Sequence, residues 1–424
     1  MSKIEKLITE MCPDGASYMS LGRIANISSG NSAPQDPSLY QNGSYPFCRT
    51  SDVGKVHQSS NFFATRDFLN DEGIKQMKLF KKETILFPKS GVSTLLNHRV
   101  LLSVDAYVSS HLATIYGLSN FVNRRFLYYY LCIIKTESLL NDTSYPSLQL
   151  SVIKDIKIPV PPIEIQNEIV KILDNFTELE AELEAELEAR TKQYEFYRNK
   201  LLDFSIGRVG VSKIDQMLAE MCPDGVNQLP LHNVANSLFW LMPATPKFDS
   251  SMDIPYITSK NIRSGKIDFS SVKYISENEY MQLSRNRNIE VDDVLVSMIG
   301  TLGEIAVYEE KYGRLYGQNM YLIRLNKEKI SVRYFYYYFD SIKMKKYFNS
   351  IKNSSSQGYL KAGHINNLVI PLPPLEIQNE IVKILDTFSE YVTSISEGLP
   401  AEINARRKQY DYYRSKLLTF SGGA

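Results

Sequence analysis

The chain has 424 residues, 43% of them hydrophobic and 22% charged, with a formal net charge of +1 at pH 7. This composition is typical of soluble globular proteins and predicts two or three domains, while a net charge so close to zero argues against a general polyanion binder. No apolar run is long and charge-free enough to cross a bilayer, and the first ten residues lack the apolar core of a signal peptide, so we expect a cytoplasmic protein.

Cysteine and histidine spacing exclude two further classes. Cys12, Cys48, Cys132 and Cys222 are widely scattered and form no C-x-x-C pair, which indicates neither a disulfide framework nor a zinc site. The five histidines show no metal-ligand spacing. We therefore expect reduced cysteines and no metal site.

The chain begins with a short repeat. The sequence KLITEMCPDG at 6–15 returns as QMLAEMCPDG at 216–225. Each copy predicts a short amphipathic helix that ends at a Pro-Asp-Gly turn.

Two globular regions follow these helices, at 16–157 and 226–369, and they share an order of elements more than a sequence. Each has strand-like segments leading to polar clusters, then a tyrosine-rich helix, and closes with a polar loop. This order predicts an α/β (mixed α+β) fold with an internal pseudo-twofold repeat. The matching segments are 45–56 with 254–267, 83–94 with 292–308, 106–116 with 315–325, 124–134 with 333–348 and 141–150 with 353–365.

Each globular region leads into a long periodic segment, at 158–204 and 370–420. Both copies start with a proline run, which predicts an abrupt helix start, and both contain EIQNEIVKILD. Apolar residues then alternate in steps of four and three, as in a coiled-coil seam. The predicted seam comprises Ile165, Ile169, Ile172, Phe176, Leu179, Leu183, Leu187, Ile377, Ile381, Ile384, Phe388, Ile395, Leu399 and Ile403.

A helix of roughly 40 residues spans about 60 Å and must bury its apolar stripe. We expect the two copies to pair antiparallel and form a rigid bar between the globular regions; two separate helices, each packed on its own region, are the alternative. Gly398 and Pro400 predict a kink or a break in the second copy.

Charge is distributed unevenly. Residues 178–189 are three ELEA tetrads with six glutamates and no basic residue, so the rest of the chain carries a formal net charge of +7. A positive remainder around an acidic, solvated helix face is compatible with nucleic-acid contact by the globular regions.

This arrangement resembles the specificity subunit of bacterial and archaeal type I restriction-modification systems over its full length. The resemblance is carried by the duplicated order and by the motifs IPVPPIEIQNEIVKILD at 158–174 and IPLPPLEIQNEIVKILD at 370–386. It implies two target-recognition domains, at 1–157 and 207–369, and two spacer helices, at 158–206 and 370–424.

The resemblance also implies the function and the partners. Each recognition domain would read one half of a bipartite double-stranded DNA site, and the paired helices would set the gap between the halves. The subunit would be non-catalytic, would recruit two methyltransferase subunits that use S-adenosylmethionine, and would be joined by two restriction subunits that use ATP and Mg²⁺. One tetrad adds about 6 Å of helix, which equals one to two base pairs of half-site spacing at about 3.4 Å per base pair. The alternative is that ELEA is simply a strong helix-forming sequence.

Base reading requires paired donors and acceptors, which we seek in the polar loops after strands. Any single candidate is also compatible with a solvated loop residue or a phosphate contact. The candidates are Arg49, Thr50, Ser51, Lys89, Ser90, Ser93, His111, Ser144 and Tyr145 in the first domain, and Ser259, Lys260, Asn261, Arg263, Gln318, Asn319, Ser355, Gln357, Tyr359 and Lys361 in the second.

Aromatic clusters allow two interpretations each. The tyrosines at 128–130 and 336–338 could stack on bases, but their helical spacing favours the core or a partner surface. The helix tails KQYEFYRNKLL and KQYDYYRSKLL could pack against the short MCPDG helices or bind the methyltransferase partners.

Catalytic motifs are missing from the sequence, which has no Gly-Lys-Ser/Thr phosphate loop and no Asn/Asp-Pro-Pro-Tyr/Phe motif. We therefore predict a DNA-recognition subunit that is not an enzyme. A scaffold or adaptor whose globular regions bind proteins is the alternative, and a solitary nuclease is the third possibility.

Overall fold

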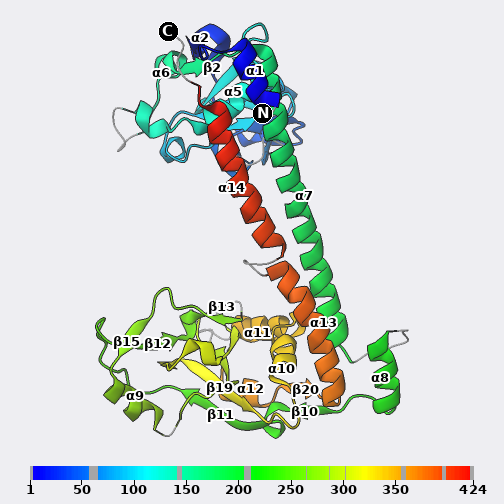
Figure 1. Cartoon of the computed structure of the whole chain (residues 1–424). Helices are drawn as coiled ribbons and strands as arrows, with labels where there is room; N and C mark the ends of the chain where they lie inside the picture. The colour runs from blue at the N-terminus through cyan, green and yellow to red at the C-terminus, as the bar shows by residue number, and fades with distance from the viewer. Residues whose placement is uncertain are drawn as a thin grey trace. The chain divides into compact units, whose positions relative to one another are not determined.

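The structure is a computed structural model that describes residues 3–56, 65–140, 146–204, 212–263, 265–285, 287–300, 302–354, 360–393 and 398–420. The chain divides into two compact units (Figure 1). Unit 1 comprises Met1–Glu186 with Ala401–Ala424, and unit 2 comprises Leu187–Pro400. The end of the chain therefore completes the unit in which the chain begins.

Unit 1 contains a main sheet of order β2-β8-β5-β6 and a second sheet of order β4-β3-β7, in which β3 is antiparallel to β4 and parallel to β7. The pair β1-β9 joins the N-terminal segment to the start of the long helix. The strands are β1 (Tyr18–Ser20), β2 (Ala25–Ser29), β3 (Tyr45–Cys48), β4 (Asp67–Leu69), β5 (Ile85–Pro88), β6 (Val100–Leu101), β7 (Tyr107–Val108), β8 (Leu112–Gly117) and β9 (Lys157–Pro159). The helices before α7 are α1 (Lys3–Met11), α2 (Leu21–Ile24), α3 (Thr50–Val56), α4 (Asp71–Ile74), α5 (Arg124–Ile133) and α6 (Leu150–Asp155), with 3-10 turns at Pro37–Tyr40, Val92–Thr94 and Thr136–Leu139.

Unit 2 repeats this topology, with a main sheet β11-β19-β16-β17, a second sheet β15-β12-β18 and a pair β10-β20, plus a pair β13-β14. The strands are β10 (Gln228–Pro230), β11 (Ala235–Leu241), β12 (Ile254–Thr258), β13 (Ile262–Arg263), β14 (Lys266–Ile267), β15 (Lys273–Ile275), β16 (Val294–Ser297), β17 (Ile305–Val307), β18 (Tyr316–Gln318), β19 (Met320–Leu325) and β20 (Val369–Pro371). The helices are α8 (Lys213–Met221), α9 (Glu277–Ser284), α10 (Val332–Phe339), α11 (Ile342–Ser354), α12 (Ala362–Asn366) and α13 (Leu375–Thr393), with 3-10 turns at Leu231–Asn233, Ser259–Asn261 and Glu310–Tyr312. The mixed α/β fold and its internal repeat are thus confirmed.

The central strand of each main sheet, β5 or β16, is buried on both faces, and its successive residues point to opposite sides. In β5, Ile85 and Phe87 contact the core that the helices cover, whereas Leu86 contacts the core shared with the second sheet. In β16, Val294 and Leu295 divide in the same way. Each unit is therefore layered as helices, main sheet and second sheet.

The short repeated helices form as predicted. Helix α1 ends at Met11 and helix α8 ends at Met221, and a turn follows each. The turns close on Gly15 and Gly225, whose φ angles of +87° and +95° favour glycine.

The long helix α7 (Ile163–Leu202) is continuous, whereas its repeat is interrupted. Helix α13 ends at Thr393 and helix α14 (Leu399–Leu418) starts after Gly398, whose φ of +83° ends the interruption. The predicted break is therefore confirmed, and Pro400 lies in the first turn of α14, where its missing N–H has no helical partner to lose.

Helix pairing is antiparallel within each unit. In unit 1, Phe176 stacks on Tyr413 with ring centroids 5.4 Å apart, and Arg407 contacts Glu180 at 2.5 Å. In unit 2, Tyr197 stacks on Phe388 at 5.7 Å. The seam positions differ in exposure: Ile165, Ile169, Ile377 and Ile381 are fully buried, Leu179 is 44% exposed, and Ile395 lies outside the described residues.

The repeated glutamine of EIQNEIVKILD ties each long helix to its unit. The amide of Gln166 is fully buried; it accepts a hydrogen bond from Asn123 N–H at 2.8 Å and donates to the carbonyls of Pro161 at 2.8 Å and Phe121 at 3.2 Å. Gln378 makes the equivalent contacts with Ser331, Pro373 and Lys329. Since Asn123 and Ser331 cap α5 and α10, one side chain positions two helices in each unit.

The repeated aspartate of the same motif has an equally clear role. Asp174 accepts hydrogen bonds from Tyr129 at 2.5 Å and from Arg125 at 2.7 Å. Asp386 accepts hydrogen bonds from Tyr337 and Arg333 in the same way. The identical letters in the two helices are therefore explained by identical packing against the tyrosine-rich helices.

Candidate nucleic-acid interface

Sheet topology gathers the polar loops of unit 1 at one edge. The parallel strands β3 and β7 end there, at Cys48 and Val108. The register pairs Pro88 with Leu112, so β5 also ends, and β8 begins, at the same edge. The loops 49–51, 89–93 and 109–111 are thereby brought together from distant parts of the chain. We call this the recognition edge of unit 1.

Lys89, Ser90 and His111 meet at this edge. The Ser90 hydroxyl lies 2.7 Å from His111 Nδ1, and Lys89 N–H donates to the His111 carbonyl at 3.0 Å. Ser93 donates to the Ser90 carbonyl at 3.2 Å. His111 is exposed, so its ring is held by Ser90 with its other nitrogen free to face a ligand.

The described part of the closing loop joins the same edge. Leu148 N–H donates to the Lys89 carbonyl at 2.7 Å, and Gly91 N–H donates to the Pro146 carbonyl at 2.9 Å. Ser144 and Tyr145, two of the predicted readers, lie outside the described residues.

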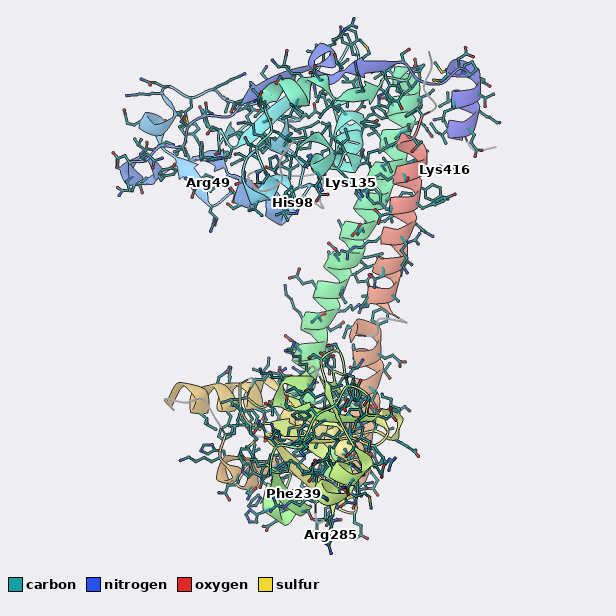
Figure 2. The ribbon with its side chains drawn as sticks, turned by 90° about the vertical axis from the view of Figure 1, so that its left-hand side faces the viewer. Arg49, His98, Lys135, Phe239, Arg285 and Lys416 are labelled. Carbon is teal, nitrogen blue, oxygen red and sulfur yellow. The ribbon has the colours of Figure 1, made fainter. Side chains whose placement is uncertain are left out.

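Arg49 is committed to partners inside unit 1. Figure 2 labels this residue in unit 1. Its guanidinium pairs with Asp67, donates to the Tyr40 hydroxyl at 3.0 Å and lies over the rings of Tyr40 and Phe47. Partial burial opposes the charged form, yet the contact with Asp67 leaves the pKa of Arg49 above its ordinary value. Thr50 and Ser51 are the first two residues of the neighbouring helix α3, and the Ser51 hydroxyl accepts a hydrogen bond from Arg66 at 3.4 Å. Arg49 is thus a support for this edge rather than a free donor.

Unit 2 presents an equivalent edge. Strands β12 and β18 run parallel and end at Thr258 and Gln318, and the register pairs Ser297, the end of β16, with Met320, the start of β19. The closing loop again approaches the end of the central strand, because Leu360 N–H donates to the Met298 carbonyl at 3.0 Å.

Two of the unit 2 candidates serve the loop itself. Asn261 is 4% exposed; its side-chain Oδ1 accepts from Thr258 N–H at 2.9 Å, and its side-chain Nδ2 donates to the Asp268 carbonyl at 2.9 Å. Ser259 is also buried. A buried amide with both ends satisfied holds a turn and has little left to offer a base.

Other unit 2 candidates remain accessible. Lys260 and Arg263 are exposed. Arg263 Nε donates to the Lys260 carbonyl at 3.0 Å, and this contact orients the guanidinium group of Arg263. Gln318 accepts from Tyr256 at 3.3 Å, and Asn319 adopts a φ of +63° as it turns the chain into β19.

The remaining candidates divide between placed and undescribed residues. Lys361 is exposed before α12, and its backbone N–H donates to His364 Nδ1 at 3.2 Å. Ser355, Gln357 and Tyr359 lie outside the described residues.

Sequence reasoning missed Asn31, which ties the unit 1 edge together. Its backbone N–H donates to the Val108 carbonyl at 2.6 Å, and its carbonyl accepts from Ser110 N–H at 2.7 Å. A polar residue just after a strand was the available signal, but the strand β2 lies more than seventy residues from its partner β8 and the contact depends on their register.

The tyrosine clusters belong to the core. Tyr128, Tyr129, Tyr337 and Tyr338 are all buried, which excludes base stacking by these rings in this structure. The helix tails also pack inward on one face, where Tyr194 joins the hydrophobic core of unit 2.

All four cysteines are free. Within the described ranges, no helix is long and apolar enough to span a membrane. The same ranges contain no group of His, Cys, Asp and Glu side chains arranged to hold a metal ion.

Comparisons with known proteins agree with this organisation. The sequence matches the type I restriction modification DNA specificity domain twice, over residues 13–189 and 230–405. It is 28% identical to a putative type I restriction enzyme specificity subunit from Haemophilus influenzae over 95% of this chain and 94% of the relative. It is 30% identical to a type I restriction enzyme specificity subunit from Escherichia coli over 70% of each chain.

Solved structures show the same fold. The S subunit of a type I restriction-modification system from M. genitalium superposes with a TM-score of 0.55 at 16% identity, over 95% of this chain and 96% of that chain. A chain from a structure describing assembly of the type I R-M system gives a TM-score of 0.58 at 15% identity, over 95% of this chain and 97% of the other. Two matched domains, two recognition edges and full-length relatives lead to one conclusion: the chain belongs to the type I restriction-modification specificity subunits, the non-catalytic DNA-recognition family of these systems.

Proposed function

We propose that the two recognition edges read the two halves of a bipartite site in double-stranded DNA. One observation supports this proposal above all. The same sheet edge carries different polar side chains in the two units, Lys89 and His111 in unit 1 and Lys260 and Arg263 in unit 2, on a repeated scaffold. A common frame with divergent edge residues suits two readers of different sequences.

Side-chain chemistry assigns separate tasks at each edge. Lysine and arginine donate to guanine O6 and N7, and a histidine ring can donate to or accept from a base edge. We propose Lys260 and Arg263 as base readers in unit 2, and Lys89, Ser90 and His111 as readers in unit 1. Arg49 and Asn261 would instead hold the loops, because their polar atoms are already paired inside the protein.

We propose that the paired helices α7, α13 and α14 set the gap between the half-sites. The three ELEA tetrads lie within one unbroken helix, so each tetrad accounts for about 6 Å of its length. A change in tetrad number would therefore change the helix without disturbing either recognition edge.

Partner docking is the other role that we infer for the long helices. Phe196 and Tyr412 occupy equivalent positions in the helix tails and are 61% and 62% exposed. Met11 and Met221, at the ends of the repeated short helices, are also exposed. Aromatic and methionine side chains are enriched in protein interfaces, and a surface that occurs twice suits two identical methyltransferase subunits.

Chemistry in such a complex would belong to the partners. The methyltransferase subunits would supply S-adenosylmethionine chemistry, and two restriction subunits would use ATP and Mg²⁺. Since the substrate is host or incoming DNA, we infer that the complex acts in the cytoplasm.

An adaptor that binds only proteins is the competing function, and the salt dependence of binding separates the two. Contacts to DNA phosphates release counterions, so DNA affinity falls steeply as salt rises, whereas an apolar protein interface responds little. The exposed lysine and arginine at the unit 2 edge favour the DNA function.

The test is N6-methyladenine mapping of genomic DNA from cells with and without the gene, in the presence of the methyltransferase partner. We expect one bipartite motif to lose methylation when the gene is deleted. Lys260→Ala with Arg263→Ala should relax or abolish only one half of the motif, while Lys266→Ala, an exposed lysine nearby, should leave both halves intact. The same methylation pattern in cells with and without the gene would contradict the proposal.

A further inference from the structure

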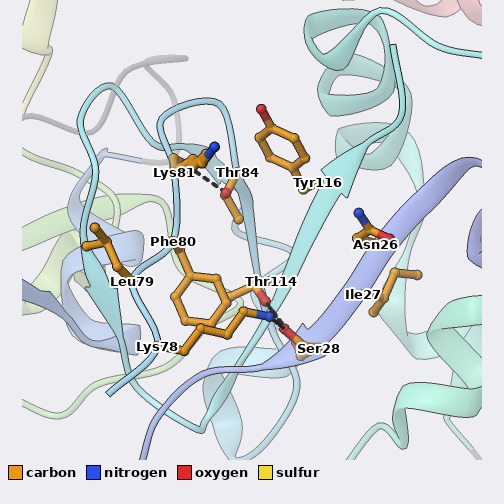
Figure 3. Close-up of a pocket in the computed structure, with 10 residues that line it drawn as sticks. All are labelled: Asn26, Ile27, Ser28, Lys78, Leu79, Phe80, Lys81, Thr84, Thr114 and Tyr116. Atoms are coloured by element: carbon orange, nitrogen blue, oxygen red, sulfur yellow. Dashed lines mark hydrogen bonds between the residues drawn. The ribbon is translucent and has the colours of Figure 1, made fainter. Parts of the chain in front are cut away.

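Unit 1 has an open polar groove beside β2 and β8, on the same face of the main sheet as Leu86. The groove has a volume of about 550 Å³ (Figure 3). Two lysines and several hydroxyl and amide groups line it, together with the ring of Phe80. Ser28, Lys78, Phe80, Lys81 and Thr114 are among the lining residues.

Hydrogen bonds build the floor of the groove. The hydroxyls of Ser28 and Thr114 lie 2.9 Å apart across the two strands, and Lys78 Nζ donates to Ser28 Oγ at 3.2 Å. Figure 3 shows the Lys78 ammonium pointing toward these hydroxyls. An ammonium has three N–H donors, so this contact leaves two for a ligand.

The fold does not require a polar surface at this place. The Ser28–Thr114 pair of unit 1 corresponds by register to the Phe239–Leu322 pair of unit 2. Leu322 is fully buried in unit 2, and Phe239 packs against the same core. Where one repeat buries apolar side chains, the other repeat leaves hydroxyls facing a cavity.

The charged side chains of the two faces differ as well. Lys81, four residues before Ile85, corresponds to Glu290, four residues before Val294, in the aligned strands. The unit 2 hollow is lined by Glu290, Asp292 and Asp293, which pair with Arg324 and Lys327. In unit 1 the neighbouring carboxylate of Glu83 is paired with Arg124 at 2.6 Å, so it does not neutralise the two lysines.

Hydrogen bonds connect the wall of the groove to the recognition edge. Asn31 Nδ2 donates to the Lys78 carbonyl at 2.9 Å, and Lys78 N–H donates to Asn31 Oδ1 at 2.8 Å. Asn31 also accepts from Ser110 N–H, one residue before His111. A single asparagine thus joins the groove wall to the loop that carries His111.

We propose that this groove, through Lys78 and Lys81, binds the phosphodiester backbone of the DNA whose bases lie at the recognition edge of unit 1. Lysines supply point charges for phosphate oxygens, and the flanking hydroxyls supply neutral donors, as in contacts that position DNA without reading its sequence. The hollow of unit 2 carries paired carboxylates where unit 1 carries these lysines, so phosphate anchoring is asymmetric between the units. This inference rests on the proposed function.

The experiment compares binding of a mixed-sequence duplex to the full chain and to the Lys78→Gln, Lys81→Gln variant at several salt concentrations. Each lost phosphate contact lowers the slope of log affinity against log salt by about 0.9, so the slope should fall by about 1.8. Between 50 and 200 mM salt, the unmodified chain should then lose about twelvefold more affinity than the variant. The matched control is Lys311→Gln with Lys327→Gln, which removes the same charge from unit 2 and should leave the slope unchanged.

A second measurement uses the unmodified chain and does not depend on variants folding. Acetylation of surface lysines, followed by mass spectrometry, should show Lys78 and Lys81 protected by duplex DNA and Lys311 and Lys327 unprotected. Suppose that the chain binds duplex, that the variant has the same salt slope as the unmodified chain, and that DNA does not protect Lys78 and Lys81. This result would refute phosphate binding by the groove but would leave the proposed role of the recognition edges intact. Failure of the unmodified chain to bind any duplex would overturn both proposals, and protection by inorganic phosphate alone would overturn the assignment of DNA as the ligand.

Discussion

Removal of the buried glutamine of EIQNEIVKILD should loosen the attachment of the long helix to its unit. We consider Gln166→Leu, which keeps nearly the same volume and deletes every polar atom. Gln166 is fully buried and makes three hydrogen bonds, to Asn123 N–H and to the carbonyls of Pro161 and Phe121. The substitution leaves one buried donor and two buried carbonyls without these partners.

An unsatisfied buried polar group costs about 1–3 kcal/mol, and carbonyls tolerate the loss better than an N–H does. The sum for Gln166→Leu is therefore about 3–6 kcal/mol. Because Asn123 is the N-cap of α5, the loss should appear first as opening of that helix. At 1.4 kcal/mol per tenfold, even about 3 kcal/mol lowers the protection of the α5 amides by about a hundredfold.

Hydrogen exchange with mass spectrometry on peptides covering 117–133 measures this protection directly. Lys171→Leu provides the control, since Lys171 is exposed one turn further along the same helix and its replacement should change protection little. Gln378→Leu should produce the same effect in unit 2, on the peptides of α10. Protection within threefold of the unmodified chain in both glutamine variants would refute the role assigned to the buried amide.

Gln166→Glu tests the direction of the hydrogen bonds. A carboxylate can still accept from Asn123 N–H, but it faces two carbonyls and has no donor for them. Burial therefore favours the neutral acid and raises the folded pKa of the introduced glutamate above its unfolded value of about 4.3. Because the fold favours the neutral glutamic acid, the free energy of unfolding should be highest below the unfolded pKa of about 4.3. It should fall as pH rises through the folded pKa. A variant whose stability increased from pH 4 to pH 7 would contradict this orientation of the amide.

Three further predictions concern other parts of the chain. Asp340→Asn should destabilise unit 2 by about 3–5 kcal/mol in denaturant unfolding, because Arg198 is 4% exposed and would lose its 2.7 Å carboxylate partner; a cost no larger than that of an exposed aspartate would contradict it. Burial raises the pKa of Tyr336 and of Tyr338 to about 12, so the neutral phenols are favoured in the fold; the free energy of unfolding should fall as pH rises above about 10, and unfolding at pH 11 should add phenolate absorbance beyond that of the folded chain. Deleting one ELEA tetrad from 178–189 should shorten the gap of the methylated motif by one to two base pairs with both half-sites unchanged, whereas replacing it with four other helix-forming residues should keep the gap, as methylation mapping can show.

Part of the fold was predictable from local patterns. The proline runs predicted where α7 and α13 begin, and the helix break followed from Gly398 and Pro400, because proline and glycine act through their own backbone geometry. The alternation of apolar residues and the duplicated order predicted a repeated mixed α/β unit. These signals depend on residues a few positions apart, which is why they can be read without a structure.

The candidate site was less accessible to sequence reasoning. Arg49 and Asn261 have the chemistry of base readers, but the structure shows their polar atoms paired with Asp67 and Tyr40, and with Thr258 and Asp268. A side chain shows its chemistry in the sequence but not whether that chemistry is already used by a neighbour in space. The sorting of the polar candidates into supports and accessible readers therefore required the fold.

The sequence alone determined that the chain is a duplicated protein, with two α/β regions, two long helices that start at prolines, and polar loops after strands. Only the tertiary structure decided which loops share an edge, which glutamine and aspartate join the helices to the sheets, and that unit 1 has a lysine-lined groove where unit 2 has buried apolar side chains. The reason is physical. Helix starts and strand periodicity arise from interactions between near neighbours, whereas the Ser28–Thr114 contact joins residues 86 positions apart and exists only because β2 and β8 pair in one particular register.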